Sequence, residues 1–254
     1  MYSKVTHNIV EEHFQNPQMA AAAAGGSIKP PGANSILPPA KAPMASPIDQ
    51  SLNFNSPLPY YVMTEPTMLF RMDSRTLWSK YMWGLLNYGI ALNAGLGDVE
   101  NIKLRLAKYA ADLGDMISPY YGITSGNEFT VRLTDIINNG AAIVQAVKAG
   151  QPIDQLVASW QIPVNDLCKF LHELNPNNWP QALLNDTFTA LTTFWVHSIQ
   201  ARARNDIIAD NLAVDQLSKL VITGVVNSSP THKATSLADI FSRGIIAQFP
   251  GLFS

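Results

Sequence analysis

The composition of this chain changes sharply near residue 70, and the change limits what each part can fold into. Before it the sequence is rich in Pro, Ala, Gly, Ser and Asn, as in Lys29-Pro30-Pro31-Gly32 and Leu37-Pro38-Pro39-Ala40. Proline fixes φ and removes a backbone donor, so these stretches favour polyproline II over helix or a central strand. We therefore expect residues 1–70 to be an extended, largely irregular arm that builds no core of its own.

After residue 70, apolar residues recur with the 3.6-residue period of amphipathic helices, and strand signals are absent. A first helix is predicted from Ser74 to Ala94. Further helices are predicted from Asp98 to a stop at Pro119, from a capping box at Ser125 to Gly150, from Pro152 to Leu174 with a kink or break at Pro163, from Pro180 to Ala209, and from Ala213 to Gln248 with an interruption at 228–230. The sequence thus predicts an all-α antiparallel bundle of about six helices over residues 71–254.

Charge and hydropathy exclude several classes of partner. A net charge of −2 gives no basic footprint, so we expect no nucleic-acid binding. No window approaches the roughly 20 apolar residues of a membrane-spanning helix, and the N-terminal residues lack the apolar stretch of a signal peptide. These features predict a cytoplasmic protein.

Only 14% of residues are charged, against roughly 25% in typical soluble domains. A surface covered by partners and a biased genome composition both explain that deficit.

One segment of the arm differs from the rest because it spaces large apolar side chains along an extended chain. These are Phe54, Leu58, Tyr60 and Tyr61. A peptide that docks into pockets has this pattern. We expect the four side chains to lie on another protein surface, either that of their own bundle or that of a neighbouring subunit.

The sequence Asn175-Pro176-Asn177-Asn178-Trp179-Pro180 predicts a structural turn between two helices. Asn side chains cap and bridge turns, so we expect this role for Asn175, Asn177 and Asn178. We expect Trp179 to lie beneath the turn and Pro180 to open the next helix.

This turn and several other segments of the sequence carry a resemblance to a known family. The other segments are Pro119-Tyr120-Tyr121-Gly122, the following Gly126-Asn127, Gly244-Ile245-Ile246-Ala247-Gln248-Phe249-Pro250, and the tryptophans Trp78 and Trp83. Residues 74–254 resemble a poorly characterised bacterial helical-bundle family with relatives in large DNA viruses. Its members are often labelled glycosyltransferase or acetylglutamate kinase without the motifs of either. The resemblance does not reach the arm.

The family pattern implies inward-facing His and acidic residues in the first, third and fifth helices. This chain departs from that pattern. The first helix reads Ser79-Lys80-Tyr81-Met82, the third has Ile136 and Ala142, and the fifth has Thr187 and Phe194. If those polar groups form a metal or ligand site in the relatives, apolar packing replaces the site here.

The remaining candidates for chemistry have simpler structural explanations. His172 and Glu173 are adjacent and therefore point about 100° apart on a helix, which favours a helix-end role over an acid–base pair. His197 lies near Arg202 and Asp206, where an i,i+4 ion pair at the end of a helix is expected. Cys168, the only cysteine, excludes an intrachain disulfide and a cysteine zinc site, and its surroundings predict a buried thiol.

Two further patterns point to packing and loops. The five tryptophans are better explained as core and turn anchors than as a ligand-stacking box. No strand precedes Gly95, Gly97 or Gly122 to make a phosphate-binding loop. We therefore predict no catalytic, cofactor or metal site.

Two functions are consistent with these patterns. The first is a structural protein, a minor capsid component of a large DNA virus, assembled in the host cytoplasm, whose arm docks on neighbouring subunits of a large assembly. The second is a bundle that binds a small molecule or a metal and acts as an enzyme or a binding protein. The two differ in whether polar side chains meet inside the bundle.

Overall fold

The computed structural model describes residues 64–224 and 236–254, and these form an all-α helical bundle. The described residues contain no strand. Their helices are α1 (Glu65–Ala94), α2 (Val99–Tyr121), α3 (Ile123–Lys148), α4 (Asp154–Leu174), α5 (Gln181–Ala203), α6 (Ile207–Ser218) and α7 (Leu237–Gln248). A π-helical turn, Lys219–Thr223, extends α6, and a 3-10 turn, Pro250–Leu252, follows α7.

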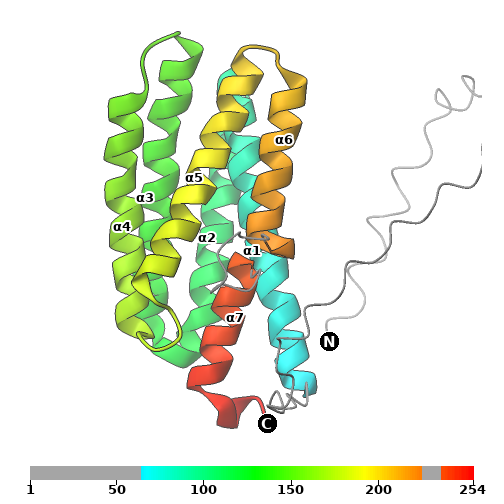
Figure 1. The fold of residues 1–254 in the computed structure, drawn as a ribbon, viewed down its shortest axis with the longest axis vertical. Coiled ribbons are helices and arrows are strands. Elements are labelled where there is room, and N and C mark those ends of the chain that lie inside the picture. The colour runs from blue at the N-terminus through cyan, green and yellow to red at the C-terminus, as the bar shows by residue number, and fades with distance from the viewer. Residues whose placement is uncertain (1–63, 225–235) are drawn as a thin grey trace, which may run out of the picture. The chain divides into compact units, whose positions relative to one another are not determined.

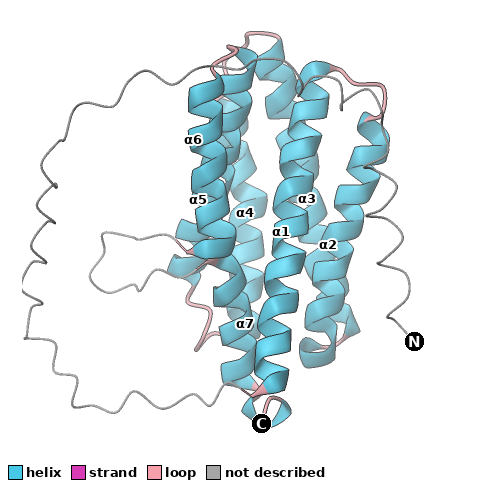
Figure 2. Cartoon of the chain, turned by 90° about the vertical axis from the view of Figure 1, so that its right-hand side faces the viewer, coloured by secondary structure: helices cyan, strands magenta, loops and turns pink. Residues whose placement is uncertain are grey.

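Short connections make α1 to α6 run alternately up and down the bundle, as Figure 1 shows. Helix α2 packs against α1 and α3, α4 packs against α3 and α5, and α6 packs against α5. Helix α7 packs against α1, which runs along the side of the bundle that faces the viewer in Figure 2. The predicted antiparallel helical bundle is confirmed.

The core is centred on aromatic side chains from four helices. Trp78 of α1 is fully buried and lies against Phe129 of α3, Phe188 of α5 and Phe241 of α7, with ring centroids 6.3, 6.1 and 4.8 Å away. Centroid separations of 4.5–7 Å are those of favourable aromatic pairs. One tryptophan therefore joins elements that lie far apart in the sequence.

The first helix begins nine residues earlier than predicted, so residues 65–70 belong to α1 and not to the arm. Thr64 is the N-cap, and its hydroxyl accepts a hydrogen bond from the backbone N–H of Thr67 at 3.4 Å. Pro66 lies in the first turn, where a missing N–H costs nothing. Ser74, the residue at which this helix was predicted to begin, is instead buried inside the helix and donates to the carbonyl of Ala238 at 2.9 Å.

The predicted stop at Pro119 and the predicted break into two short helices at Pro163 do not occur. Helix α2 continues through Pro119 to Tyr121, and α4 is one continuous helix through Pro163. Each proline leaves one carbonyl without its intrahelical donor, that of Asp115 or Ser159. Both of those residues are exposed, and the buried side chains on either side of each proline hold the helix together.

Two predicted helix ends were also wrong. Helix α3 begins directly after Gly122, and Ser125 makes no capping hydrogen bond. Helix α5 ends at Ala203 because Asn205 takes a left-handed conformation with φ 56°. Asp206 then caps α6 by accepting from the N–H of Ala209 at 3.0 Å.

Three predicted helix ends are confirmed. The first helix ends at Gly95 and the third ends near Gly150. The last helix, with Ser236 as its N-cap, ends at Gln248. The predicted interruption at 228–230 lies outside the described residues.

Candidate functional site

The predicted partner-binding residues Phe54, Leu58, Tyr60 and Tyr61 lie outside the described residues. The described residues include the predicted turn, ion-pair clusters around Asp239 and Asp210, a closed aromatic core and a grooved surface beside α1.

Asn175 lies at the centre of the turn between α4 and α5 and is buried. Its Nδ2 donates to the carbonyl of Gly244 at 2.9 Å and to the Tyr121 hydroxyl at 3.1 Å. Its Oδ1 accepts from Nδ2 of Asn178 at 2.8 Å. Asn175 therefore joins this turn to the end of α2 and to α7, while Asn177 is exposed.

Trp179 lies beneath the turn, where it is fully buried, and its indole N–H donates to the carbonyl of Ile240 at 3.0 Å. Nδ1 of His172 lies 2.9 Å from the carbonyl oxygen of Trp179, and because a carbonyl only accepts, the ring nitrogen donates. Pro180 immediately precedes α5, and its carbonyl accepts from the N–H of Leu184. These contacts give His172 the helix-end role that the sequence predicts.

We expect Asn175→Ala to lower the free energy of unfolding by about 1–2 kcal/mol, because it removes buried hydrogen bonds and leaves the carbonyl of Gly244 without this donor. Asn177→Ala is the matched control, since the same substitution at an exposed position of the same turn should change stability by less than about 0.5 kcal/mol. Urea unfolding followed by circular dichroism measures both. Equal effects at the two positions would contradict the role assigned to Asn175.

A first ion-pair cluster ties α1 to α7. Nη2 of Arg71 lies 3.0 Å from Oδ1 of Asp239, and Nη2 of Arg75 lies 3.0 Å from Oδ2. The backbone N–H of Asp239 donates to Oγ of Ser236, the N-cap of α7. The Ser236-x-x-Asp239 pattern marks a helix start in the sequence, but nothing in it identifies α1 as the partner.

Ionisation of the Asp239 carboxyl is expected to make the free energy of unfolding depend on pH. Burial alone would raise its pKa, but hydrogen bonds from Arg71 and Arg75, the charge of Arg75 and the Ser236 hydroxyl bring the pKa below its ordinary value. A pKa lowered by folding stabilises the folded chain above the unfolded-state pKa, and that contribution is lost as pH falls through the folded-state pKa. Wild type should therefore exceed Asp239→Asn in stability at pH 7, and the difference should shrink below about pH 4. Urea unfolding of both chains across this range measures it; a constant difference would contradict the assignment.

A second cluster joins α5 to α6 through Asp210, which is buried. Oδ2 of Asp210 lies 2.8 Å from Nη2 of Arg202, and Oδ1 accepts from the Ser198 hydroxyl at 2.5 Å. The predicted partner of Arg202, Asp206, instead caps α6, because the helix break at Asn205 ends the i,i+4 spacing.

Neither cluster has the composition of a catalytic centre. Both carboxylates are neutralised by arginine, and within residues 64–224 and 236–254 no three His, Cys, Asp or Glu side chains gather where a metal could bind. His197 is exposed. Cys168 is buried as predicted, and burial raises the pKa of its thiol to about 12, which opposes formation of the nucleophilic thiolate.

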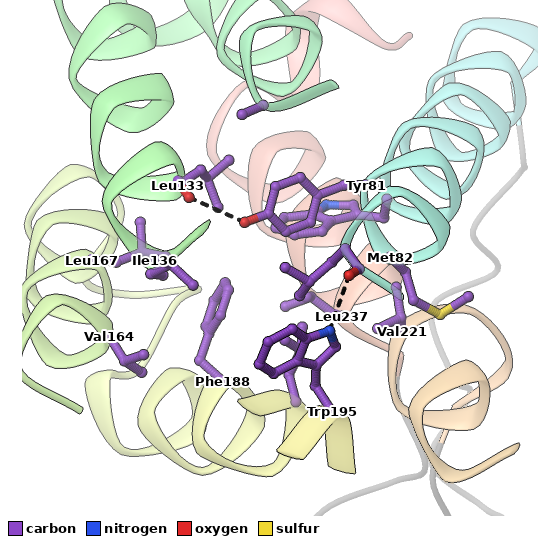
Figure 3. Close-up of a cluster of buried hydrophobic side chains, with 14 of the residues drawn as sticks. Tyr81, Met82, Leu133, Ile136, Val164, Leu167, Phe188, Trp195, Val221 and Leu237 are labelled. Atoms are coloured by element: carbon purple, nitrogen blue, oxygen red, sulfur yellow. Dashed lines mark hydrogen bonds between the residues drawn. The ribbon is translucent and has the colours of Figure 1, made fainter. Parts of the chain in front are cut away.

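The positions at which the predicted resemblance implies polar groups lie partly in the core and partly on the surface. Tyr81, Met82 and Ile136 are buried among apolar side chains, as Figure 3 shows, and the Tyr81 hydroxyl donates to the carbonyl of Leu133 at 3.2 Å. Thr187 is buried and donates to its own helix. Ala142 is exposed and Phe194 is half-buried, so these two positions do not lie inside the core as expected.

The surface beside α1 is grooved. A groove of about 380 Å³ runs between α1 and α2, with Phe70, Leu77, Met116 and Tyr120 among its apolar walls. It is also lined by Asp73, Thr76, Lys80, Asp112, Asp115 and Pro119. Trp83, predicted to be in the core with the other tryptophans, is 48% exposed farther along α1. Trp83 lies 100° around the helix from the buried Met82, and only the packing of the other helices decides which of these two positions is covered.

Comparison with protein-family models, with curated proteins and with solved structures gave no match. The fold thus defines the class, an all-α bundle, and the resemblance to the bacterial family stays a prediction. No helix in the described part of the chain is long and apolar enough to cross a membrane.

Proposed function

We propose that this chain is a structural and interaction protein that binds other protein subunits rather than a catalyst. The observation that carries the proposal is the contrast between the core and the surface. The core is closed by aromatic and aliphatic packing around Trp78, whereas the surface presents large apolar side chains on several helices. The most exposed of them are Ile123, Ile162, Ile207, Ile208 and Leu104.

The low charge of the sequence supports the same function. With only 14% charged residues, the chain has few Lys and Glu side chains to keep its surface in water, and burial against partners removes that need. Single exposed apolar residues are ordinary in proteins, so the argument rests on their combination with low charge.

The arm extends this proposal to neighbouring subunits. Phe54, Leu58, Tyr60 and Tyr61 would dock on an adjacent subunit, and the segment around them would lose conformational entropy only on docking. The resemblance to proteins of large DNA viruses supports the finer proposal of a minor capsid component. A virion location follows from that finer proposal alone.

Limited chymotrypsin digestion of the isolated chain tests the role of the arm. We expect early cleavage after Phe54, Tyr60 and Tyr61, because a segment that needs a partner to become ordered is open to the protease without one. Trp83 is the internal control, since it is exposed but held in a helix and should resist cleavage. Mass spectrometry of the fragments gives the order of cleavage. An arm as resistant as the bundle would contradict docking on a separate subunit.

A further inference from the structure

One face of α1 carries an unusual series of exposed side chains, here called the α1 crest. It consists of Leu69, Met72, Asp73, Thr76, Lys80 and Trp83, all exposed. At 100° per residue these six positions fall within about a 100° arc of the helix surface. Leu69, Met72 and Trp83 are 49%, 58% and 48% exposed. The crest is therefore a continuous solvent-facing strip about 21 Å long between Leu69 and Trp83.

Four members of the crest are arranged symmetrically about Thr76. Leu69 and Trp83 lie seven residues before and after it, and Met72 and Lys80 lie four residues before and after it. Offsets of four and seven residues return to the same helix face. If a second α1 ran antiparallel across the first with a two-fold axis beside Thr76, Leu69 of each copy would meet Trp83 of the other. Met72 would meet the aliphatic stem of Lys80.

Two charges on the crest follow the same symmetry. Asp73 lies on the Leu69 side of Thr76, and Lys80 lies on the Trp83 side. Among the residues that the structure describes, neither of these two makes an ion pair. The antiparallel arrangement would bring Lys80 of each copy to Asp73 of the other.

We propose that the α1 crest is the contact surface of a two-fold symmetric dimer of this chain, with the two α1 helices antiparallel and the axis beside Thr76. A two-fold contact uses one patch on both subunits, so the patch must complement itself in shape and charge. The crest and the adjoining groove do so through apolar contacts at their ends and opposite charges on either side of the centre. This interface is independent of the arm and of the proposed function.

The two kinds of contact would contribute differently. Tryptophan is enriched among residues that dominate binding energy, so the two copies of Trp83 would supply most of the affinity. Exposed ion pairs add little energy but set orientation and exclude wrong registers. The charges of Asp73 and Lys80 would therefore select the antiparallel arrangement.

Sedimentation equilibrium of the full-length chain tests the proposal, with circular dichroism to verify folding of each variant. We expect the wild type to dimerise and Trp83→Ala to raise the dimer dissociation constant by about 30-fold. Val131→Ala is the matched control, because Val131 is an exposed apolar side chain on α3, outside the crest, and its loss should leave dimerisation unchanged.

A charge-swap series tests the antiparallel register. Asp73→Lys and Lys80→Asp should each weaken the dimer by about 10-fold, because each places like charges together. The double variant Asp73→Lys/Lys80→Asp should return to within about threefold of wild type, since it recreates opposite pairs with the signs exchanged. A monomeric wild type, as expected if another segment or protein covers the crest, would overturn the proposal. So would a dimer that is insensitive to Trp83→Ala, or a double variant as weak as the single ones.

Discussion

Trp78→Ala is expected to lower the free energy of unfolding by about 3–5 kcal/mol, the largest effect of any single substitution considered for this chain. Trp78 is fully buried and lies between rings from α3, α5 and α7, so its removal opens a cavity at the point where four helices meet. The neighbouring rings are held by their own helices and can fill little of that space. Guanidinium unfolding followed by far-ultraviolet circular dichroism measures the change without relying on tryptophan fluorescence.

Trp83→Ala is the control for Trp78→Ala, because it removes the same side chain from the same helix at an exposed position. Measured in dilute protein, where association contributes nothing, it should cost less than about 1 kcal/mol. A large loss at Trp83, or a loss below about 2 kcal/mol at Trp78, would show that the core is not organised around Trp78.

Gly244→Ala is expected to destabilise the chain by about 3 kcal/mol, at the upper end of overpacking effects. A Cβ atom on Gly244 would lie 2.0 Å from Nε1 and 2.6 Å from Cδ1 of Trp179. Trp179 is fully buried and its N–H is bonded to the carbonyl of Ile240, so it cannot move aside without losing that bond. The methyl group would also disturb the carbonyl of Gly244, which accepts from Asn175. Urea unfolding followed by circular dichroism measures this loss.

Gly251→Ala provides the comparison for Gly244→Ala. A Cβ atom there would meet nothing within 4 Å, so this substitution, seven residues farther along, should be close to neutral. Similar losses at both glycines would indicate a general cost of replacing glycine near the C-terminal end rather than a steric conflict with Trp179.

Much of the fold could be predicted from the sequence because helices leave a local signal. Leu113, Leu133 and Leu171 recur at helical spacing with other apolar residues and are all fully buried in the structure. Glycines with left-handed backbone at Gly95 and Gly150 mark helix ends that were predicted correctly. The turn at 175–180 was also recognisable, because Asn and Pro have few other roles at such a density.

The errors share one physical cause, which is that tertiary packing overrides local preference. Pro119 and Pro163 lie within helices because the helices are held by buried neighbours. Gly126, predicted as part of a capping box, instead permits α2 and α3 to cross closely, since a Cβ atom there would lie 2.6 Å from the carbonyl oxygen of Gly114. A local pattern does not contain that distance.

The sequence by itself determined that the chain after the arm is helical, where most helices end, and that its surface carries little charge. Those properties depend on backbone preferences and on apolar periodicity, which act over a few residues. Only the tertiary structure decided which side chains meet: Arg71 with Asp239, Arg202 with Asp210, and Asn175 with Gly244. It also decided that Trp78 is core and Trp83 surface, because a rotation of 140° around one helix separates the two, and only the packing of the other helices fixes which side is covered.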